Sequence, residues 1–353
     1  MKRVLLIQNV ISSYRVPVYN QIAKEFDLTL LYSSGKIPDG VLFKTEFWSS
    51  YKKGPFSFYK RGLNGLLKRF DVVVFPYDPM QFSLLFEMLK AKLGKGPRFI
   101  PWGIGVPASY NVSYDAPTKS SKLFYYLAKW ADASIFYSDY PKRKYNSMGV
   151  LSNKMFVAHN TVEIFEPAPI EESEKNSILF VGSLYKQKGL GVLLKAYLEA
   201  KNKDNSLLPL YIIGGGDEYS SISKWITDNN LSSSIFLEGP IYDEKTLSRY
   251  FLRARACVSP NQAGLSVQKS LGYGVPFVTK ENAITGGEIF DVVNNKTGVL
   301  YKEDSCLVDI LLDISNNPHH YFEMGMAGKK FYSENRTVEI MAQGAIDAIN
   351  YVC

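Results

Sequence analysis

A chain of 353 residues is too long for one ordinary hydrophobic core, and with 46% hydrophobic residues it predicts two globular domains. Lys2 and Arg3 lead directly into a predicted strand, so we expect no signal peptide, and no apolar run approaches the roughly 20 residues that span a bilayer. The sequence therefore predicts a cytoplasmic protein, soluble or peripheral on the inner face of the cell membrane. Residues 1–165 hold 23 of the 41 Lys and Arg but 11 of the 34 Asp and Glu, net +12, which leaves −5 for residues 166–353, and the three scattered cysteines exclude a disulfide framework and a zinc site.

Short β-rich runs alternate with helical stretches from the first residues, a pattern that predicts α/β folding with parallel sheets covered by helices. In the first half of the chain, strands are predicted at residues 4–8, 27–32, 71–75, 98–101, 133–137 and 154–158. Helices are predicted at residues 17–26, 81–92 and 122–130. In the last of these, Leu123, Tyr126, Leu127 and Trp130 recur at helical spacing, a stripe that we interpret as core-facing, with membrane contact as the alternative.

Basic clusters in the first half are interleaved with aromatic residues, and two interpretations of them remain. They form either an ordinary solvated surface or a surface attracted to an anionic membrane leaflet or a polyprenyl diphosphate. Nucleic acid would attract similar charges, but the sequence holds no recognised nucleic-acid motif, so no nucleic-acid partner is predicted. The residues are Lys52, Lys53, Lys60, Arg61, Lys68, Arg69, Lys90, Lys92, Lys95, Arg98, Lys142 and Lys144, with Trp48, Phe56, Phe58, Tyr59 and Phe70.

A polar, acidic segment that is twice interrupted by proline, HNTVEIFEPAPIEESEKN, predicts an interdomain linker. A second alternating set follows, with strands predicted at residues 178–181, 210–213, 235–238, 256–258, 276–279 and 298–301. Helices are predicted at residues 191–198, 220–229, 244–253, 267–271, 306–314 and 318–330. We expect a terminal helix at 338–352 to pack back toward the first domain. The predicted domains are 1–165 and 166–335, with 336–353 as the terminal helix.

Two glycine-containing turns follow the first strands of the second half. Gly182 permits close backbone approach, and Lys188 can present a cation to a diphosphate from the entrance of the next helix, although an ordinary loop also fits these residues. The second turn holds three consecutive glycines at 214–216. A dinucleotide fingerprint would need glycine where Tyr219 stands, so a nicotinamide dehydrogenase is disfavoured.

The segment at 258–279, VSPNQAGLSVQKSLGYGVPFVT, has the frame of an anion-binding site. A strand turns through Ser259 and Pro260, and a loop with Gly264 leads into a helix at about residues 266–271. The GYGVP run ends that helix, because glycine and proline act as C-cap and stop signals. Backbone N–H groups at a helix N-terminus bind anions, so this segment suits a sugar diphosphate.

Taken in order, the motifs of residues 177–302 resemble the second domain of GT-B glycosyltransferases of family 4. ILFVGSLYKQKGLGVLLKAY is similar to the family's strand, G-R-L-x-x-x-K-G and helix element, and LYIIGGGDEY is similar to its I-x-G-x-G-P-E turn. FLEGPIYDEKTLSRYFLRARACVSP resembles the family's F-x-G-x-V…L-x-x-Y-x-x-A-D-x-x-x-x-P-S run. GYGVPFVT resembles C-G-x-P-V-V-A, and GGEIFDVVNNKTGVLY resembles the G-G-x-x-E…N-G-x-L segment that follows. The resemblance implies two Rossmann-like, doubly wound parallel-sheet domains that face a cleft.

The first half resembles a branch of the family that decorates bacterial surface polysaccharides. QNVISSYRVPVYNQIA is similar to that branch's opening, and WGIG, ADASIFYSDYPKRKY and VAHNTVE are similar to its W-G-x-G, A-D-x-x-x-x-x-S and N-x-V-D elements. The resemblance implies a nucleotide-sugar donor, by default a UDP-sugar, and a glycan or polyprenyl-diphosphate-linked acceptor. The implied donor contacts are Gly182, Ser183, Lys188, Gly214, Gly216, Pro240, Ile241, Asn261, Gly264, Leu265, Ser266, Lys269 and Glu288. The implied acceptor contacts are Asn9, Tyr14, Arg15, Trp102, Gly103 and Gly105, of which Arg15 also fits a surface charge and Trp102 fits core packing.

Three positions depart from the family pattern. The paired glutamates of the family, spaced E-x7-E, fall on Asn261 and Lys269 when the G-x-P landmarks are aligned. The arginine of G-R-L is Ser183 here, and Ile104 stands where related sequences often carry histidine. We hypothesise that Lys269 restores the diphosphate cation lost at Ser183.

The ribose hydroxyls, which the family's second glutamate holds, would then need another acceptor. Glu281 and Glu288 are the nearest acids in sequence, and Glu288 also matches the acid of the G-G-x-x-E segment. Lys188, Lys269 and Glu288 are the candidate catalytic residues.

The resemblance implies a retaining transfer, in which the acceptor attacks the front face of an oxocarbenium-like centre. The sequence contains no Asp-x-Asp motif for a divalent cation, so we expect neither metal nor cofactor, and Lys188, backbone amides and a helix dipole would meet the leaving-group charge. Two alternatives remain open. The missing glutamates also suit a non-catalytic partner subunit, and the fold also serves nucleotide-sugar epimerases.

Overall fold

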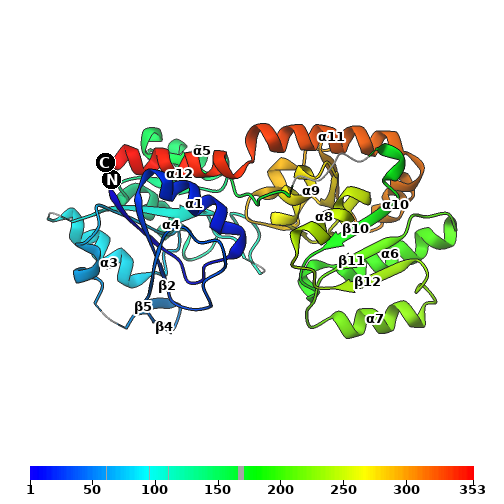
Figure 1. The fold of residues 1–353 in the computed structure, drawn as a ribbon, viewed down its shortest axis with the longest axis horizontal. Helices are drawn as coiled ribbons and strands as arrows, with labels where there is room; N and C mark the ends of the chain where they lie inside the picture. Colours follow the sequence, from blue (N-terminus) through cyan, green and yellow to red (C-terminus); the bar gives the residue numbers. More distant parts are fainter. Residues whose placement is uncertain (61, 95, 110, 166–170) are drawn as a thin grey trace. The chain divides into compact units, whose positions relative to one another are not determined.

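The computed structural model describes residues 1–60, 62–94, 96–109, 111–165 and 171–353. Arg61 and Lys95 of the basic clusters, and residues 166–170 of the predicted linker, lie outside these ranges. The chain divides into two compact units (Figure 1). Unit 1 comprises Met1–Ala108, Tyr114–Glu163 and Thr337–Cys353, and unit 2 comprises Ser109–Ser113 and Ile164–Arg336.

In unit 1, the described residues form a parallel sheet of seven strands in the order β3-β2-β1-β6-β7-β8-β9, beside an antiparallel hairpin of β4 and β5. The strands are β1 (Arg3–Ile7), β2 (Asp27–Tyr32), β3 (Lys44–Phe47), β4 (Ser50–Lys53), β5 (Phe56–Tyr59), β6 (Val72–Pro76), β7 (Arg98–Gly103), β8 (Ser134–Phe136) and β9 (Met155–Val157). The helices are η1 (Ser13–Arg15), α1 (Val16–Glu25), α2 (Asn64–Leu67), α3 (Phe82–Lys92), α4 (Ser121–Trp130), α5 (Asp139–Ser147), η2 (Ser152–Lys154) and α12 (Val338–Val352).

Alternating apolar residues build a core on each face of this sheet, as the period of a strand requires. Val4 and Leu6 of β1 face α1 and α12, whereas Leu5 and Ile7 face the layer that contains α3, α4 and α5. The terminal helix α12 packs on α1 and on the sheet through buried residues that include Met341. The predicted stripe of α4 is only partly a core stripe.

Three of the four residues of the predicted α4 stripe are exposed, contrary to the prediction that the stripe faces the core. Leu127 is buried, but Leu123, Tyr126 and Trp130 are 44%, 39% and 45% exposed. Leu127 and Ala128 are the buried residues of α4, and Phe124 and Tyr125 pack partly buried against the same core. The remaining apolar residues of the stripe therefore face outward.

In unit 2, the described residues form a parallel sheet of six strands in the order β12-β11-β10-β13-β15-β17 and a small pair, β14 with β16. The strands are β10 (Ser177–Val181), β11 (Leu210–Ile213), β12 (Ile235–Gly239), β13 (Ala254–Val258), β14 (Gln262–Ala263), β15 (Phe277–Lys280), β16 (Ile284–Thr285) and β17 (Gly298–Tyr301). The helices are η3 (Glu172–Glu174), η4 (Lys186–Lys188), α6 (Leu190–Lys203), α7 (Tyr219–Asp228), α8 (Glu244–Arg253), α9 (Leu265–Gly272), η5 (Glu288–Asp291), α10 (Cys306–Asn316) and α11 (Pro318–Asn335).

Helices cover both faces of this sheet as well. Residues of α6, α7 and α10 share one core with the strands, and residues of α8 and α9 share the other. The predicted α/β class with parallel sheets is therefore confirmed in both units. Along the described chain, no helix combines the length and the apolar character needed to cross a membrane.

Candidate functional site

The strand order of unit 2 reverses between β10 and β13, because the chain runs outward from β10 through β11 to β12 and then returns to β13. In open parallel sheets, ligands bind beyond the carboxyl ends of the strands at such a reversal, where the loops diverge. The loop after β10 carries Gly182, Ser183 and Lys188, and the loop after β13 carries Asn261 and Gly264. Sequence and topology thus lead to the same edge of the sheet.

Glycine lets the loops after β10 and β11 approach each other closely. A Cβ on Gly214 would collide with the carbonyl oxygen of Gly182, and one on Gly216 would collide with that of Leu184. Both glycines also have positive φ angles, 156° and 152°, which other residues adopt rarely. The Leu184 N–H donates to the Gly215 carbonyl at 2.9 Å, which fixes the contact.

The remaining donor candidates of this edge flank the glycine turns. The Pro240 ring lies against Gly215, 3.4 Å from the position of a Cβ there. Ile241 is partly buried against the core of α8 and α9, and Ser183 is exposed. These residues can border a ligand with backbone and apolar surface.

Lys188 supplies the positive charge of this edge. Its Nζ would lie 3.2 Å from a Cβ on Gly182, so the ammonium sits directly beside the end of β10. The residue is only 9% exposed, and burial lowers the pKa of its ammonium to about 8. Over the described ranges, we find no hydrogen bond or ion pair that this ammonium makes with the protein. A buried cation without a carboxylate partner is costly, and an anionic ligand would relieve that cost.

Asn261 ties three loops together. Its side-chain amide packs on Gly189, and its backbone N–H points at the Lys188 carbonyl at 3.4 Å. Its own carbonyl accepts the Ile284 N–H at 2.8 Å, next to the parallel pairing of β14 with β16. Gln262, which the sequence did not single out, places its Oε1 3.5 Å from the Tyr185 hydroxyl. The Lys188 loop, the Asn261 loop and the segment before Glu288 are therefore one assembly.

Helix α9 begins at Leu265, directly after Gly264. The first N–H groups of a helix have no partner within it. Those of Leu265 and Ser266 make no backbone hydrogen bond within the part of the chain that the structure describes, whereas the Val267 N–H donates to the Gly264 carbonyl at 2.9 Å. These donors and the positive end of the helix dipole complement the Lys188 charge. The predicted strand, loop and helix of this segment are present, as β13, the loop through Gly264 and α9.

Lys269 lies one turn further along α9, and its ammonium forms an ion pair with Glu244, the first residue of α8. The two side chains are 15% and 45% exposed, and the N–O distance is 2.5 Å. Lys269, which stands where the family has its second glutamate, therefore has an internal counter-ion. The sequence did not predict this ion pair, because the two residues lie far apart in the chain.

The Lys269→Ala substitution separates a ligand contact from this ion pair. If Lys269 also contacts the diphosphate, nucleoside diphosphate binding measured by calorimetry should weaken roughly ten- to a hundredfold, the value of a charge-assisted hydrogen bond. Glu244→Gln is the matched variant, because it breaks the same pair but keeps the lysine, and it should leave binding equal or tighter. Unchanged binding in Lys269→Ala would assign the residue to the ion pair alone.

Glu288 is buried at 5% exposure, and its carboxylate binds the turn that precedes it. Its carboxylate accepts the Gly286 N–H at 2.9 Å and the Thr285 hydroxyl at 3.3 Å. These contacts hold the loop before η5 in shape. Because Thr285 belongs to β16, which pairs with β14, these contacts also connect Glu288 to the Asn261 loop.

A buried polar cluster, which the sequence did not predict, lies behind α9. Asp291 receives a two-pronged contact from Arg336, with N–O distances of 2.7 and 2.6 Å, and the Gln268 amide donates to the same carboxylate at 2.5 Å. All three residues are at most 9% exposed. The cluster joins α9, η5 and the end of α11 through one carboxylate.

Two of the predicted acceptor residues are core residues of unit 1. Trp102 is 3% exposed and packs edge-on against Tyr19, so it presents no ring face to a sugar. Arg15 is 6% exposed, and its guanidinium contacts Asn160 and the Met341 sulfur of α12. Both side chains join strands and helices of unit 1, which explains their burial.

The other acceptor candidates are glycine backbone and exposed side chains. Gly103 and Gly105 are buried, and a Cβ on Gly105 would press into the Phe136 ring, so these glycines serve close packing. Asn9 is exposed, with its carbonyl accepting two serine N–H groups, and Tyr14 is 40% exposed. Among the predicted acceptor residues, Asn9 and Tyr14 keep accessible side chains.

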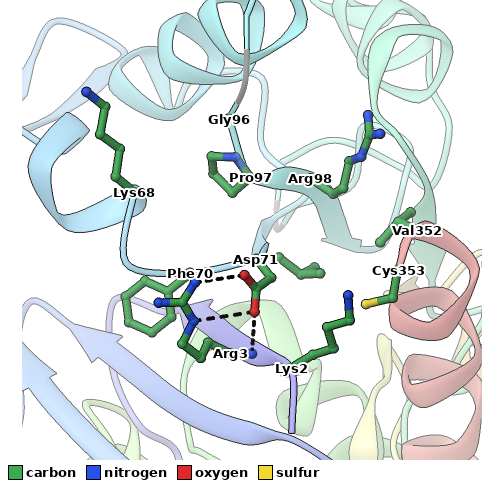
Figure 2. Close-up of a pocket in the computed structure, with 11 residues that line it drawn as sticks. Lys2, Arg3, Lys68, Phe70, Asp71, Gly96, Pro97, Arg98, Val352 and Cys353 are labelled. Atoms are coloured by element: carbon green, nitrogen blue, oxygen red, sulfur yellow. Dashed lines mark hydrogen bonds and ion pairs between the residues drawn. The ribbon is translucent and has the colours of Figure 1, made fainter.

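A further pocket, of about 360 Å³, lies at the amino ends of β1, β6 and β7 in unit 1 (Figure 2). Its basic residues include Arg3, whose guanidinium and backbone N–H bind the Asp71 carboxylate at 2.9 Å, and Arg98, which lies 3.4 Å from Asp132. Both arginines are already bridged to acids. The pocket also lies at the amino ends of the strands, whereas ligands of open parallel sheets bind beyond the carboxyl ends.

The chain has recognisable relatives, and a family model matches its second half. Residues 162–331 match the model of the family described as glycosyl transferases group 1. The chain is 28% identical over 250 residues to an uncharacterized 41.2 kDa protein in the cps region of Klebsiella pneumoniae, a match that covers 65% of each chain. It is 26% identical over 219 residues to the uncharacterized glycosyltransferase MJ1178 of Methanocaldococcus jannaschii, covering 60% of this chain and 58% of that protein. The matches thus span less than two thirds of these relatives.

Solved structures share the architecture over the whole chain. HepE of Anabaena in complex with UDP-glucose has a TM-score of 0.73 at 13% identity, with 99% of this chain and 100% of that chain covered. TarM of S. aureus in complex with fondaparinux, alpha-GlcNAc-glycerol and UDP has a TM-score of 0.71 at 13% identity and the same coverage. A structure assigned as a UDP-N-acetylglucosamine 2-epimerase of Listeria monocytogenes has a TM-score of 0.67 at 15% identity, covering 99% and 95%.

Identities this low show the fold alone, while the family model identifies the second half. Together they confirm the resemblance drawn from the motifs of residues 177–302. The chain has the GT-B fold, and its residues 162–331 match the model of the glycosyl transferases group 1 family.

Proposed function

We propose that this chain is a retaining, metal-independent glycosyltransferase that moves a sugar from a nucleotide-sugar, by preference a UDP-sugar, to a glycan or lipid-linked acceptor. The observation that carries the proposal is the buried Lys188 ammonium beside Gly182, at the carboxyl end of β10 and without a protein acceptor over the described ranges. A diphosphate supplies the missing negative charge. The family of residues 162–331 supports the reaction class.

Several similarities support the choice of substrates. HepE was solved with UDP-glucose, and TarM was solved with UDP and alpha-GlcNAc-glycerol. The Klebsiella relative is named for a cps region, which supports a role in surface polysaccharide biosynthesis. The basic surface of unit 1 suits a lipid-linked acceptor and a peripheral position on the inner face of the cell membrane.

In the proposed reaction, the bond between the anomeric carbon and the diphosphate breaks while the acceptor oxygen bonds to the same face of the sugar. The acceptor proton passes to the departing phosphate oxygen. Lys188 and the first N–H groups of α9 would stabilise the charge that develops on the diphosphate. Because the sequence has no Asp-x-Asp motif, we propose that no divalent cation takes part.

A panel of nucleoside diphosphates in a thermal-shift assay tests the donor site. UDP at a hundred times its dissociation constant should raise the free energy of unfolding by about 2.7 kcal/mol. The midpoint should rise by roughly 5–10 °C, and GDP and dTDP should do less. Transfer activity that persists in EDTA would support metal independence. A protein that responds to none of the nucleotides would contradict the donor assignment.

Two other functions have an observation in their favour. The Listeria structure assigned as an epimerase shares the fold, and the replacement of two family glutamates by Asn261 and Lys269 suits a non-catalytic partner subunit. An epimerase would interconvert nucleotide-sugars without an acceptor. A partner subunit alone would neither hydrolyse donors nor transfer sugar, so product analysis with and without acceptor separates the three functions.

A further inference from the structure

Helix α3 is apolar on two faces, although unit 1 covers only one of them. Leu84 and Met88 are buried against the sheet. Phe82, Phe86, Leu89 and the C-cap Leu93 follow one another at helical spacing, which places them together on the outer face, and they are 49%, 51%, 43% and 91% exposed. Ser83, Glu87 and Lys90 separate the two apolar faces on one side of the helix, and the described residues of unit 1 leave the outer face exposed.

The exposed apolar surface continues from α3 onto the hairpin of β4 and β5. The Phe82 ring centroid lies 5.9 Å from that of Phe56 and 5.5 Å from that of Phe58. Tyr51 stacks on Phe58 at 5.6 Å, and Tyr51 and Phe56 are 47% and 38% exposed. We call this surface the aromatic patch. It comprises Tyr51, Phe56, Phe58, Phe82, Phe86, Leu89 and Leu93.

Lysines border the aromatic patch. The exposed Lys53 of β4 lies on the same face as its cross-strand partner Phe56, Lys60 follows β5, and Lys90 and Lys92 lie in the last turn of α3. The Lys90 ammonium stands 4.2 Å from the centre of the Phe86 ring and 3.1 Å from the carboxylate of Glu87, the acid of α3. Four lysines against this single helix acid give the patch a positive border.

We propose that the aromatic patch docks unit 1 on an anionic phospholipid surface, with its rings and leucines in the interface and its lysines on the headgroups. Phe and Leu on one face, with Lys at the border, is the composition of helices that lie in a membrane interface. Long lysine side chains reach headgroups while their stems cover apolar surface. The charge of the border selects an anionic leaflet over a neutral one. The role rests on the proposed function, because a lipid-linked acceptor would be met at this surface.

Vesicle sedimentation of the full chain tests the docking. Vesicles of phosphatidylcholine with phosphatidylglycerol should bind the protein, whereas vesicles of phosphatidylcholine alone should bind it weakly, and salt should release it. Phe86→Ser with Leu89→Ser should reduce the bound fraction by about tenfold, and Lys53→Glu with Lys60→Glu should abolish the preference for the anionic lipid. The matched control is Leu42→Ser with Leu151→Ser, two residues of unit 1 outside the patch that are 76% and 66% exposed, and it should bind like the wild type.

Nucleotide binding separates failure of this proposal from failure of the proposed function. The Phe86→Ser and Leu89→Ser variant should keep the UDP-induced thermal shift of the wild type, since the patch is on unit 1 and the donor candidates are on unit 2. A wild type that binds vesicles but no nucleotide would contradict only the proposed function. Equal binding to neutral and anionic vesicles, or a dimer in sedimentation velocity that the same variant dissociates without any vesicle binding, would overturn the docking.

Discussion

Replacing Lys188 with alanine is expected to lower kcat/KM for the nucleotide-sugar by about a hundredfold or more, the effect of removing one preorganised donor from a developing anion. The ammonium is buried beside Gly182, so water cannot replace its charge in the variant. Binding of UDP should weaken in parallel. The variant should still fold, because alanine removes a buried cation that has no ion pair over the described ranges. Thermal unfolding without ligand checks this expectation.

Lys188→Arg and Lys195→Ala complete the test. Arginine keeps the charge and should retain more of the donor affinity than alanine does. Lys195 is an exposed lysine of α6, and its replacement by alanine should change neither activity nor binding. A Lys188→Ala enzyme with wild-type kcat/KM would remove the residue from the donor site.

The pH dependence of catalysis should carry the signature of Lys188. Burial lowers the pKa of its ammonium to about 8 in the free protein, well below the ordinary value of 10.5. The diphosphate needs the charged form, which predominates below pH 8 and is lost as the pH rises through 8. We therefore expect kcat/KM, which reports on the free enzyme, to fall above about pH 8 in the wild type. In Lys188→Ala this alkaline limb should disappear.

Local patterns in the sequence predicted most of the fold. The apolar run at 178–181 became β10, and the helical spacing at 244–253 became α8, because burial on a sheet imposes the period that the sequence displays. The hairpin of β4 and β5 was missed. Its alternating aromatic and basic residues leave one face exposed, so they resembled a surface cluster rather than paired strands.

Contacts between distant residues were beyond the reach of the sequence patterns. Lys188, Gly182 and the start of α9 were found because they follow strands that end at one edge of a parallel sheet. The partner of Lys269, Glu244, lies 25 residues away on another helix. The sequence left core packing open for Trp102, and this residue is buried in β7. For Arg15 it offered only a surface charge or an acceptor contact, because the contacts that bury it, Asn160 and Met341, lie far along the chain.

Breaking the ion pair of Arg336 and Asp291 is expected to cause the largest loss of stability. Asp291→Asn removes the counter-ion of a guanidinium that is 9% exposed, and an uncompensated buried charge costs about 3–5 kcal/mol. For a unit of this size, the unfolding midpoint should fall by roughly 6–20 °C in calorimetry. Asp304→Asn is the matched control, since its pair with Lys280 is 48% exposed on the acid and should contribute at most about 1 kcal/mol.

The Asp291 carboxylate should affect donor binding as well as the stability of unit 2. Asp291 ends η5, which begins with Glu288, and it accepts the amide of Gln268 on α9. Asp291→Asn should therefore also raise the donor KM more than it lowers kcat, because the elements that hold the diphosphate lose a common anchor. The double replacement Asp291→Leu with Arg336→Met should recover stability, since an apolar pair often matches a buried ion pair. Recovery of stability without recovery of KM would show that the carboxylate positions α9, whereas recovery of both would limit its role to charge compensation.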